Sequence, residues 1–367
     1  MGEILFVTWD GGGNVPPAVG IAEELKGRGH HVRFMGHARQ APGFAETGLE
    51  FTAFPTARPF DSTVPATPLT VLACFSDRAM GADVLAELEA RPADVVVVDC
   101  LLFSVLDALH TAGRSYVALE HSFDTCWRRM AKGPFGLLLR LRGMKALALL
   151  DGGEPTMAAT IPSLDTGHGD VVHTGPVVSG VPATPSRPTV LVSLSTFAFK
   201  GLEPTWQRVL DAVAPLDARV VATTGPAVDA GRLRVPANVE LHSWLPHADV
   251  MPEVSMVVGH GGHATTMVAL AHDLPLLVIP MDALTDQPFI GKAIERAGAG
   301  RTMGRKSSPE KIRAAVEELL ADGPHRAAAA RLGAEVRGLP GAERGANTVE
   351  ALLRNGAAAP RRPSSRS

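Results

Sequence analysis

A glycine-rich turn between a short apolar run and a helix-forming stretch carries the strongest chemical signal in this sequence. Its residues are Gly259-His260-Gly261-Gly262-His263-Ala264-Thr265-Thr266. The turn follows the predicted strand Met256–Val258 and precedes the predicted helix Met267–Ala271. Glycines let the backbone approach an anion closely. The amides of a helix start, with the Thr265 and Thr266 hydroxyls, can then hold a diphosphate, and His260 can donate to a phosphate oxygen. Because such turns also form for packing reasons, this string alone leaves the diphosphate site open.

Two further groups of residues follow other predicted strands of the same half. Trp244 lies sixteen residues before His260. Beside a diphosphate its flat face could stack on a pyrimidine base, whereas an isolated loop Trp is usually a core plug or a lid. Asp286 and Gln287 follow the predicted strand Leu276–Ile279. A carboxylate beside an amide suits hydrogen bonds to vicinal sugar hydroxyls, although such a pair at a helix start is by default a cap. The three groups in this order are more specific than any one of them.

Elements that could position these residues recur along the whole chain. Short β-branched runs alternate with helical stretches, which is typical of βαβ units and parallel sheets. Examples are the predicted strands Ile4–Trp9 and Ser115–Leu119, and Val95–Asp99 is apolar on both faces, as expected for an interior parallel strand. Ligands of such sheets bind at the carboxyl ends of the strands. The chemistry is therefore expected at those ends.

The chain divides at a segment rich in proline and glycine, Gly175–Pro188, whose composition indicates an ordered linker. A new buried strand, Thr189–Ser195, follows it. We predict an α/β protein with a first domain over residues 1–180, a second domain over residues 181–356, and a disordered tail over residues 357–367.

Composition excludes several classes of protein. The chain has 367 residues, of which 46% are hydrophobic and 20% charged, so it can bury substantial cores and is not globally disordered. Its 35 Lys and Arg residues against 38 Asp and Glu residues argue against nucleic-acid binding. The three cysteines (Cys74, Cys100 and Cys126) have no CxxC spacing and form no zinc or disulfide motif. They fit a reduced cytoplasmic protein.

Membrane and export signals are also missing from the sequence pattern. The N-terminus has no basic region followed by a long apolar stretch. The most apolar stretch, Phe135–Leu150, is interrupted by Arg140, Arg142 and Lys145, so it cannot span a bilayer. We interpret it as an amphipathic helix with a basic face and expect a soluble, cytoplasmic protein without an integral membrane segment.

The ordered groups resemble a known signature. Trp244-x-Pro246, His260-Gly-Gly-x-x-Thr265 and Asp286-Gln287 resemble the nucleotide-sugar signature of GT-B fold glycosyltransferases, in the family that includes plant and macrolide transferases. The whole layout is similar to the actinobacterial antibiotic branch of that family. The resemblance implies two Rossmann-like α/β/α domains facing across a cleft, the first for the acceptor and the second for the nucleotide sugar. It also implies inverting, metal-independent transfer from a dTDP- or UDP-sugar to a small hydrophobic natural product, with no cofactor beyond that co-substrate.

The resemblance extends to the donor site, with two departures. It implies donor contacts from Ser195, Trp244, His260, Gly261, Gly262, Thr265, Thr266, Asp286 and Gln287. Where plant relatives place a ribose-binding Glu, this chain has Val268. The segment Met281–Thr285 is also a couple of residues longer than usual. The sugar and its nucleotide therefore stay open.

The acceptor side departs from the family at its catalytic base. The resemblance implies that the acceptor is deprotonated by a residue in the turn after the first strand, three residues before a Pro. In this chain that position is Asn14, which is not titratable. An amide is not a base, although it can orient the acceptor. Asp10, in the same turn, and His121, with Glu120 and Asp124 beside it, are the candidate bases. Both residues also have a structural explanation that remains open. Asp10 could simply form the turn, and His121 could be a strand-end residue whose hydrogen bonds are satisfied. An acidic acceptor, or attack by carbon, would need less help.

Aromatic residues after His121 are candidates for the acceptor pocket. Phe123 and Trp127 could line it, although core packing explains them equally well. Two other functions remain open: a GT-B-type nucleotide-sugar epimerase, and a catalytically silent auxiliary protein, which the loss of a base at Asn14 suggests. Expected partners are a nucleotide sugar and a small hydrophobic acceptor. The oligomeric state is open, a homodimer included.

Overall fold

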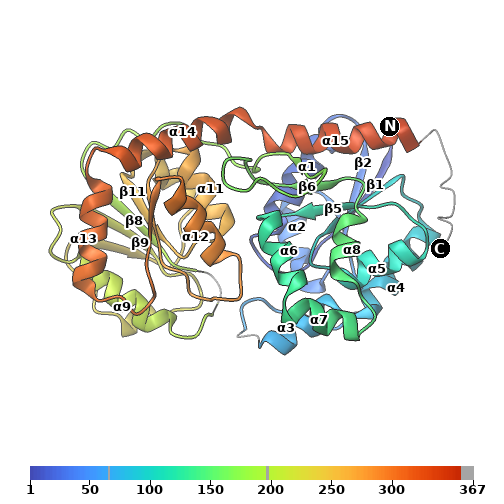
Figure 1. The fold of residues 1–367 in the computed structure, drawn as a ribbon, viewed down its shortest axis with the longest axis horizontal. Helices are drawn as coiled ribbons and strands as arrows, with labels where there is room; N and C mark the ends of the chain where they lie inside the picture. Colours follow the sequence, from blue (N-terminus) through green and yellow to red (C-terminus); the bar gives the residue numbers. More distant parts are fainter. Residues whose placement is uncertain (65–66, 196–197, 357–367) are drawn as a thin grey trace.

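Two lobes, each a parallel sheet covered by helices, make up the molecule (Figure 1). The computed structural model describes residues 1–64, 67–195 and 198–356. The predicted tail over residues 357–367 lies outside the described residues. Every strand pair in both sheets is parallel within the described chain. The structure confirms the prediction of two parallel α/β domains.

The first sheet has the strand order β3-β2-β1-β4-β5-β6-β7. Its strands are β1 (Glu3–Val7), β2 (His31–Gly36), β3 (Glu50–Ala53), β4 (Val95–Asp99), β5 (Val117–Glu120), β6 (Thr156–Ala158) and β7 (Val172–His173). The helices of this lobe are α1 (Val15–Gly27), α2 (Ala41–Thr47), α3 (Pro68–Phe75), α4 (Arg78–Ala90), α5 (Phe103–Thr111), α6 (Asp124–Lys132), α7 (Pro134–Leu141) and α8 (Ala146–Asp151).

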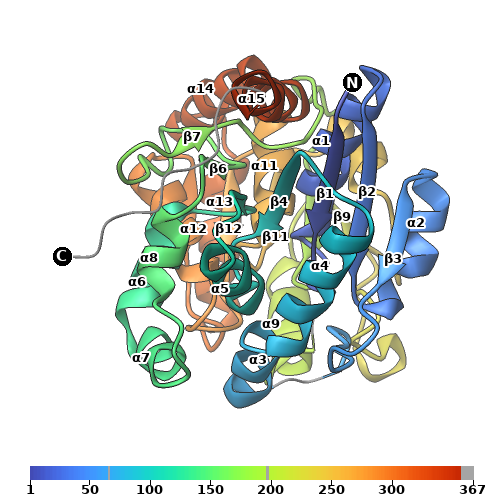
Figure 2. The same ribbon diagram turned by 90° about the vertical axis from the view of Figure 1, so that its right-hand side faces the viewer.

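Alternate side chains of the central strands fill two separate cores. Leu5 and Val96 pack toward α4 and α5, which face the viewer in Figure 2. Ile4 and Val97 pack toward α1 on the other face. Because β4 is covered on both faces, its sequence is an unbroken apolar run up to Asp99.

The second sheet has the order β10-β9-β8-β11-β12-β13. Its strands are β8 (Thr189–Ser193), β9 (Arg219–Thr223), β10 (Val239–His242), β11 (Met256–Gly259), β12 (Leu276–Val278) and β13 (Gly300–Thr302). The helices that follow the linker are α9 (Leu202–Val213), α10 (His247–Val250), α11 (His263–Ala271), α12 (Gln287–Arg296), α13 (Pro309–Leu320), α14 (Pro324–Gly338) and α15 (Gly341–Gly356). Helices α9 and α13 pack on one face, and α11, α12 and α14 on the other.

The last helix returns to the first lobe. Figure 1 shows α15 running along α1. Ala346 and Val349 are fully buried in the first lobe's core, and Glu350 pairs with Arg28 and His30 at 3.0 and 3.1 Å. Helix α15 therefore belongs with the first domain, which corrects the prediction that residues 181–356 form one unit. Pairing between residues so distant in sequence leaves no local signal.

Two helix predictions also need correction. The stretch Phe135–Leu150 is two helices, because α7 ends at Leu141, Gly143 adopts a φ of 86°, and α8 begins at Ala146. The helix predicted over Met267–Ala271 begins earlier, at His263. Among the described helices, none is both long and apolar enough to cross a membrane.

Candidate active site

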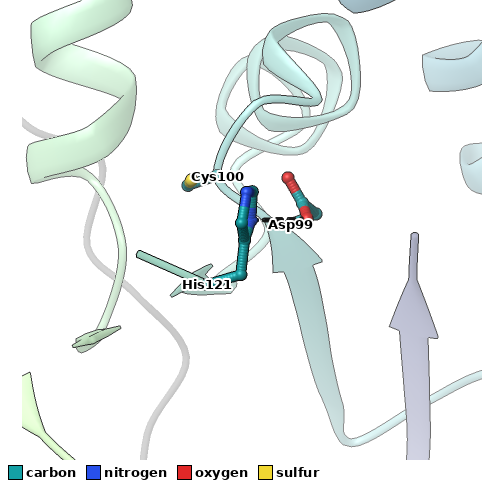
Figure 3. Close-up of side chains that lie close together, drawn as sticks. All are labelled: Asp99, Cys100 and His121. Carbon is teal, nitrogen blue, oxygen red and sulfur yellow. Dashed lines mark ion pairs between the residues drawn. The ribbon is translucent and has the colours of Figure 1, made fainter. Parts of the chain in front are cut away.

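The carboxyl ends of β1, β4 and β5 bring three polar side chains together. Asn14 follows β1, Asp99 ends β4, and His121 follows β5. Asn14 Nδ2 donates to Asp99 Oδ2 at 3.0 Å. His121 Nδ1 lies 3.1 Å from the same oxygen (Figure 3). Because β1, β4 and β5 are adjacent, their ends deliver one carboxylate shared by an amide and an imidazole.

Asp99 makes His121 a stronger base than an isolated buried imidazole. Burial alone would lower the pKa of His121, but the adjacent Asp99 carboxylate, followed by the charge of Asp286, outweighs it and leaves the pKa raised. A carboxylate behind an imidazole also fixes its orientation and stabilises the imidazolium that forms when it takes a proton. The pair can therefore serve as a general base.

The carboxylate partner of His121 is not the one predicted. The sequence predicts Glu120 and Asp124 beside His121, whereas the structure pairs it with Asp99. Asp99 was missed as a site residue, although a signal was present. It is the first polar residue after the apolar run Val95–Val98, so it had to lie at the carboxyl edge of the sheet.

Asn14 is held as a positioning group. Its Nδ2 also lies within hydrogen-bonding distance of Thr8 Oγ1 and the Trp9 carbonyl, both at 3.2 Å. Its Oδ1 is buried and has no hydrogen-bond partner among the described residues. Asn14 thus fixes the position of Asp99, and its Oδ1 is left without a partner among the described residues.

Asp10 is engaged elsewhere. Its Oδ2 lies 3.5 Å from Arg39 Nε and accepts the Ser62 backbone N–H at 3.3 Å. The contacts described for Asp10 include neither Asp99 nor His121. The structure therefore gives this candidate base an ion pair, not a place in the His121 cluster.

Asp124, the first residue of α6, belongs to a cluster of charged side chains. It is fully buried and accepts a hydrogen bond from Arg128 Nε at 2.6 Å, while Arg128 Nη2 lies 2.7 Å from Asp151 Oδ1. Glu120 is also fully buried, and burial, followed by the charge of Asp124, holds its pKa well above the usual value. Asp124 is thus committed to Arg128 and Glu120, which corrects the prediction that it assists His121.

This cluster predicts a pH-dependent stability. Glu120→Gln is expected to raise the melting temperature at pH 8, and the gain should vanish as the pH falls toward the unfolded-state carboxyl pKa of about 4.3. The folded chain holds a proton on Glu120 that the unfolded chain releases, so wild-type stability falls as the pH rises through the raised pKa. Glutamine carries no such penalty. Thermal scans from pH 4.5 to pH 8 measure the difference, with Glu89→Gln on the exposed face of α4 as control. A gain that is equal at all pH values would contradict the prediction.

The predicted diphosphate turn forms the start of α11. Gly261 has a φ of +85°, and a Cβ there would lie 2.8 Å from Val278 Cγ1 and 2.9 Å from the Gln287 carbonyl. A Cβ on Gly262 would lie 2.5 Å from His260 Nε2. Gly261 therefore lets the turn pack closely against Val278 and Gln287, and Gly262 leaves room for the His260 imidazole at the helix start. Burial lowers the pKa of His260 to about 4, so the ring is neutral at neutral pH.

The two threonines of this turn differ in what they can offer. The Thr266 hydroxyl donates to the Gly262 carbonyl at 2.9 Å and is buried. Its hydroxyl proton is thus used inside the helix, contrary to the prediction that it serves a diphosphate. Thr265, in the same first turn, is half-buried. Ser195, after β8, is buried.

The other donor candidates are placed at neighbouring strand ends. Trp244, after β10, is 69% exposed, so its face is accessible to a ligand. Asp286 does not cap α12 with its side chain; its Oδ2 accepts a hydrogen bond from Ser122 Oγ of the first domain at 2.7 Å. Gln287 Oε1 accepts the backbone N–H groups of Met281 and Asp282 at 2.7 and 3.2 Å. Gln287 therefore shapes the loop, and its carbonyl oxygen is already occupied.

Aromatic side chains border the His121 cluster. The Trp127 ring lies 5.1 Å from the His121 ring. Phe123 packs edge-on against His263 of α11, with 6.0 Å between ring centroids. Phe123 and Trp127 are both buried, and the contact with His263 places Phe123 at the junction of the two domains.

A thiol lies close to the pair. Cys100 Sγ, a carboxylate oxygen of Asp99 and a ring nitrogen of His121 all lie within 4.8 Å of one another. In the view of Figure 3 the thiol and the carboxylate lie to either side of the imidazole. Burial raises the pKa of the Cys100 thiol well above its usual value, so a protonated thiol lies beside the His121–Asp99 pair.

Comparisons with known proteins find related chains. Residues 207–352 match the family model described as "Erythromycin biosynthesis protein CIII-like, C-terminal domain". The 4'-demethylrebeccamycin synthase of Lentzea aerocolonigenes is 28% identical, over 90% of this chain and 94% of that protein. The demethyllactenocin mycarosyltransferase of Streptomyces fradiae is 26% identical, over 96% and 87% of the two chains.

Solved structures share the fold. The calicheamicin glycosyltransferase CalG4 superposes with a TM-score of 0.79 at 24% identity, covering 98% of this chain and all of that one. The glycosyltransferase VinC, solved in complex with dTDP, gives a TM-score of 0.73 at 22% identity, with 96% and 99% covered. These likenesses confirm the predicted two-domain GT-B architecture.

Proposed function

The chain is a glycosyltransferase of the GT-B fold with an EryCIII-like C-terminal domain, and we propose that it transfers a sugar, with inversion and without a metal ion, from a dTDP- or UDP-sugar to a small hydrophobic natural product. The observation that carries the proposal is the His121–Asp99 pair, with Nδ1 3.1 Å from Oδ2. It lies in the first domain at a junction to which the second domain contributes the start of α11. In this proposal the first domain thus supplies the base and the second domain supplies the diphosphate cradle.

In the proposed reaction the acceptor hydroxyl attacks the anomeric carbon from the face opposite the diphosphate. As the new C–O bond forms, the bond to the diphosphate oxygen breaks and His121 takes the hydroxyl proton through Nε2, because Nδ1 faces Asp99. The leaving diphosphate takes the electron pair of the broken bond. The α11 amides, His260 and the Thr265 hydroxyl stabilise the resulting negative charge. No residue forms a covalent intermediate, so the configuration inverts.

The nucleotide and acceptor classes rest on the relatives. VinC was solved with dTDP, and the spinosyn rhamnosyltransferase SpnG with thymidine diphosphate. The relatives include a 4'-demethylrebeccamycin synthase, a TDP-daunosamine transferase and a tylactone mycaminosyltransferase. We therefore favour a dTDP-sugar and a polycyclic or macrocyclic acceptor. The buried Phe123 and Trp127 provide an apolar lining for such an acceptor. No cofactor beyond the nucleotide sugar is proposed.

A mass-spectrometric screen tests this function. Purified chain is incubated with dTDP- and UDP-hexoses and a panel of phenols, carboxylic acids and macrolactones, with and without EDTA. The expected result is a sugar-mass addition that survives EDTA, with an anomeric configuration opposite to that of the donor by NMR. Retained configuration or loss of activity in EDTA would contradict the mechanism. Epimer formation without an acceptor, or nucleotide binding without a product, would favour the epimerase or auxiliary alternative.

A further inference from the structure

A second imidazole at the domain junction has no part in the proposed mechanism. His263 is the first residue of α11 and is only 8% exposed. Its Nε2 is buried and has no hydrogen-bond partner in the part of the chain that the structure describes. Because buried polar atoms are nearly always paired in native proteins, this ring nitrogen is a candidate for binding a group from outside the chain.

The surroundings of His263 belong to both domains. The residue is part of the donor-side helix, but its ring packs edge-on against Phe123 of the acceptor-side domain, at 6.0 Å and 87°. It is also close enough to His121 for the charge of His121 to disfavour its protonation. In a transfer reaction the sugar must lie between the diphosphate cradle and the base. His263 lies where these two sides meet.

The charge state of His263 narrows the kind of ligand. Burial, followed by the positive charge of His121, lowers the pKa of His263 to about 3, so the ring is neutral near pH 7. A neutral ring with so low a pKa is a weak base, so it suits a hydrogen bond to a hydroxyl better than a proton transfer. His260 and the helix amides already provide the contacts suited to the diphosphate.

We propose that His263 is a specificity-determining residue that forms a hydrogen bond through Nε2 to a hydroxyl group of the transferred sugar. This assignment rests on the proposed function. It distinguishes His263 from His121, which moves a proton, and from His260, which contacts the diphosphate. The sugar class expected at this site has a hydroxyl directed at the start of α11.

His263→Phe removes Nε2 and keeps an aromatic ring against Phe123. Isothermal titration measures the dissociation constants of dTDP and of dTDP-glucose, and the ratio of the two is compared between variant and wild type. We expect dTDP binding within about twofold of wild type and a loss of about tenfold for dTDP-glucose, the effect of one lost hydrogen bond to a buried partner. The acid limb of the pH–rate profile should stay in place. His263→Gln, which keeps a side-chain N–H, should recover part of the loss.

Controls separate the outcomes. His110→Phe, exposed on α5, should match wild type in both affinities. An equal loss for dTDP and dTDP-glucose would overturn the assignment in favour of a phosphate contact, and a shifted acid limb would overturn it in favour of proton transfer. Unchanged affinities for both dTDP and dTDP-glucose would overturn the assignment and leave His263 with a packing role only. If His263→Phe does not fold, the ratio for His263→Gln decides. Wild-type chain that binds neither nucleotide would instead overturn the proposed function.

Discussion

Transfer by a His121→Ala variant is expected to be slower by about 10²- to 10⁴-fold, the contribution of a positioned general base. The acceptor hydroxyl would lose its proton acceptor, while the donor cradle on α11 stays intact. Initial rates at saturating donor and acceptor measure the loss. Affinity for the nucleotide sugar should change little, because His121 belongs to the other domain. A rate within a few-fold of wild type would mean that the acceptor needs no protein base, as an acidic phenol or carboxylic acid would not.

The pH dependence of the same step tests the role of Asp99. Wild-type activity should fall with decreasing pH as His121 is protonated, with an apparent pKa above the usual value because Asp99 stabilises the imidazolium. Asp99→Asn removes that stabilisation and should move the acid limb of the profile to lower pH, although the maximal rate falls. Asp10→Asn is the comparison, because its carboxylate pairs with Arg39. An acid limb that stays in place in Asp99→Asn, or moves in Asp10→Asn, would transfer the base assignment away from His121.

His260→Ala is expected to reduce kcat by about 10²- to 10³-fold, the cost of removing one preorganised donor to the charge that develops in the transition state. His260 packs over Gly262 at the start of α11, where the diphosphate is proposed to bind. With a pKa lowered to about 4, the ring is neutral near pH 7, so the loss should be the same from pH 6 to pH 9. His110→Ala on the exposed end of α5 serves as control.

Donor binding distinguishes this variant from His121→Ala. His260→Ala should weaken dTDP-sugar binding, measured by titration calorimetry without an acceptor, whereas His121→Ala should not. Near-wild-type turnover of a folded His260→Ala chain would remove the basis for placing the diphosphate at α11. A loss of kcat that grows steeply with falling pH would show that the charged imidazolium, and not the neutral ring, stabilises the transition state.

The sequence by itself determined the elements and the donor turn. Strand Val95–Asp99 forms over the predicted residues, because a strand covered on both faces must be apolar throughout, and that pattern is local. The glycines of the α11 turn are equally local, since Gly261 adopts a positive φ and a side chain on Gly262 would strike His260. Trp244 and Asp286 follow strands of the same sheet, so their common edge was predictable.

Only the tertiary structure shows that His121 pairs with Asp99 and that α15 packs on the first domain. Asn14 and Asp99 are 85 residues apart in sequence and meet because β4 lies between β1 and β5. That strand order has no signature in the residues of any one strand. Residues adjacent in sequence also parted at the strand end: His121 faces Asp99, while Glu120 is buried toward Asp124. Successive side chains of a strand point to opposite faces. The neighbours of a catalytic group are therefore set by the strand across the sheet and not by the next residue in the chain.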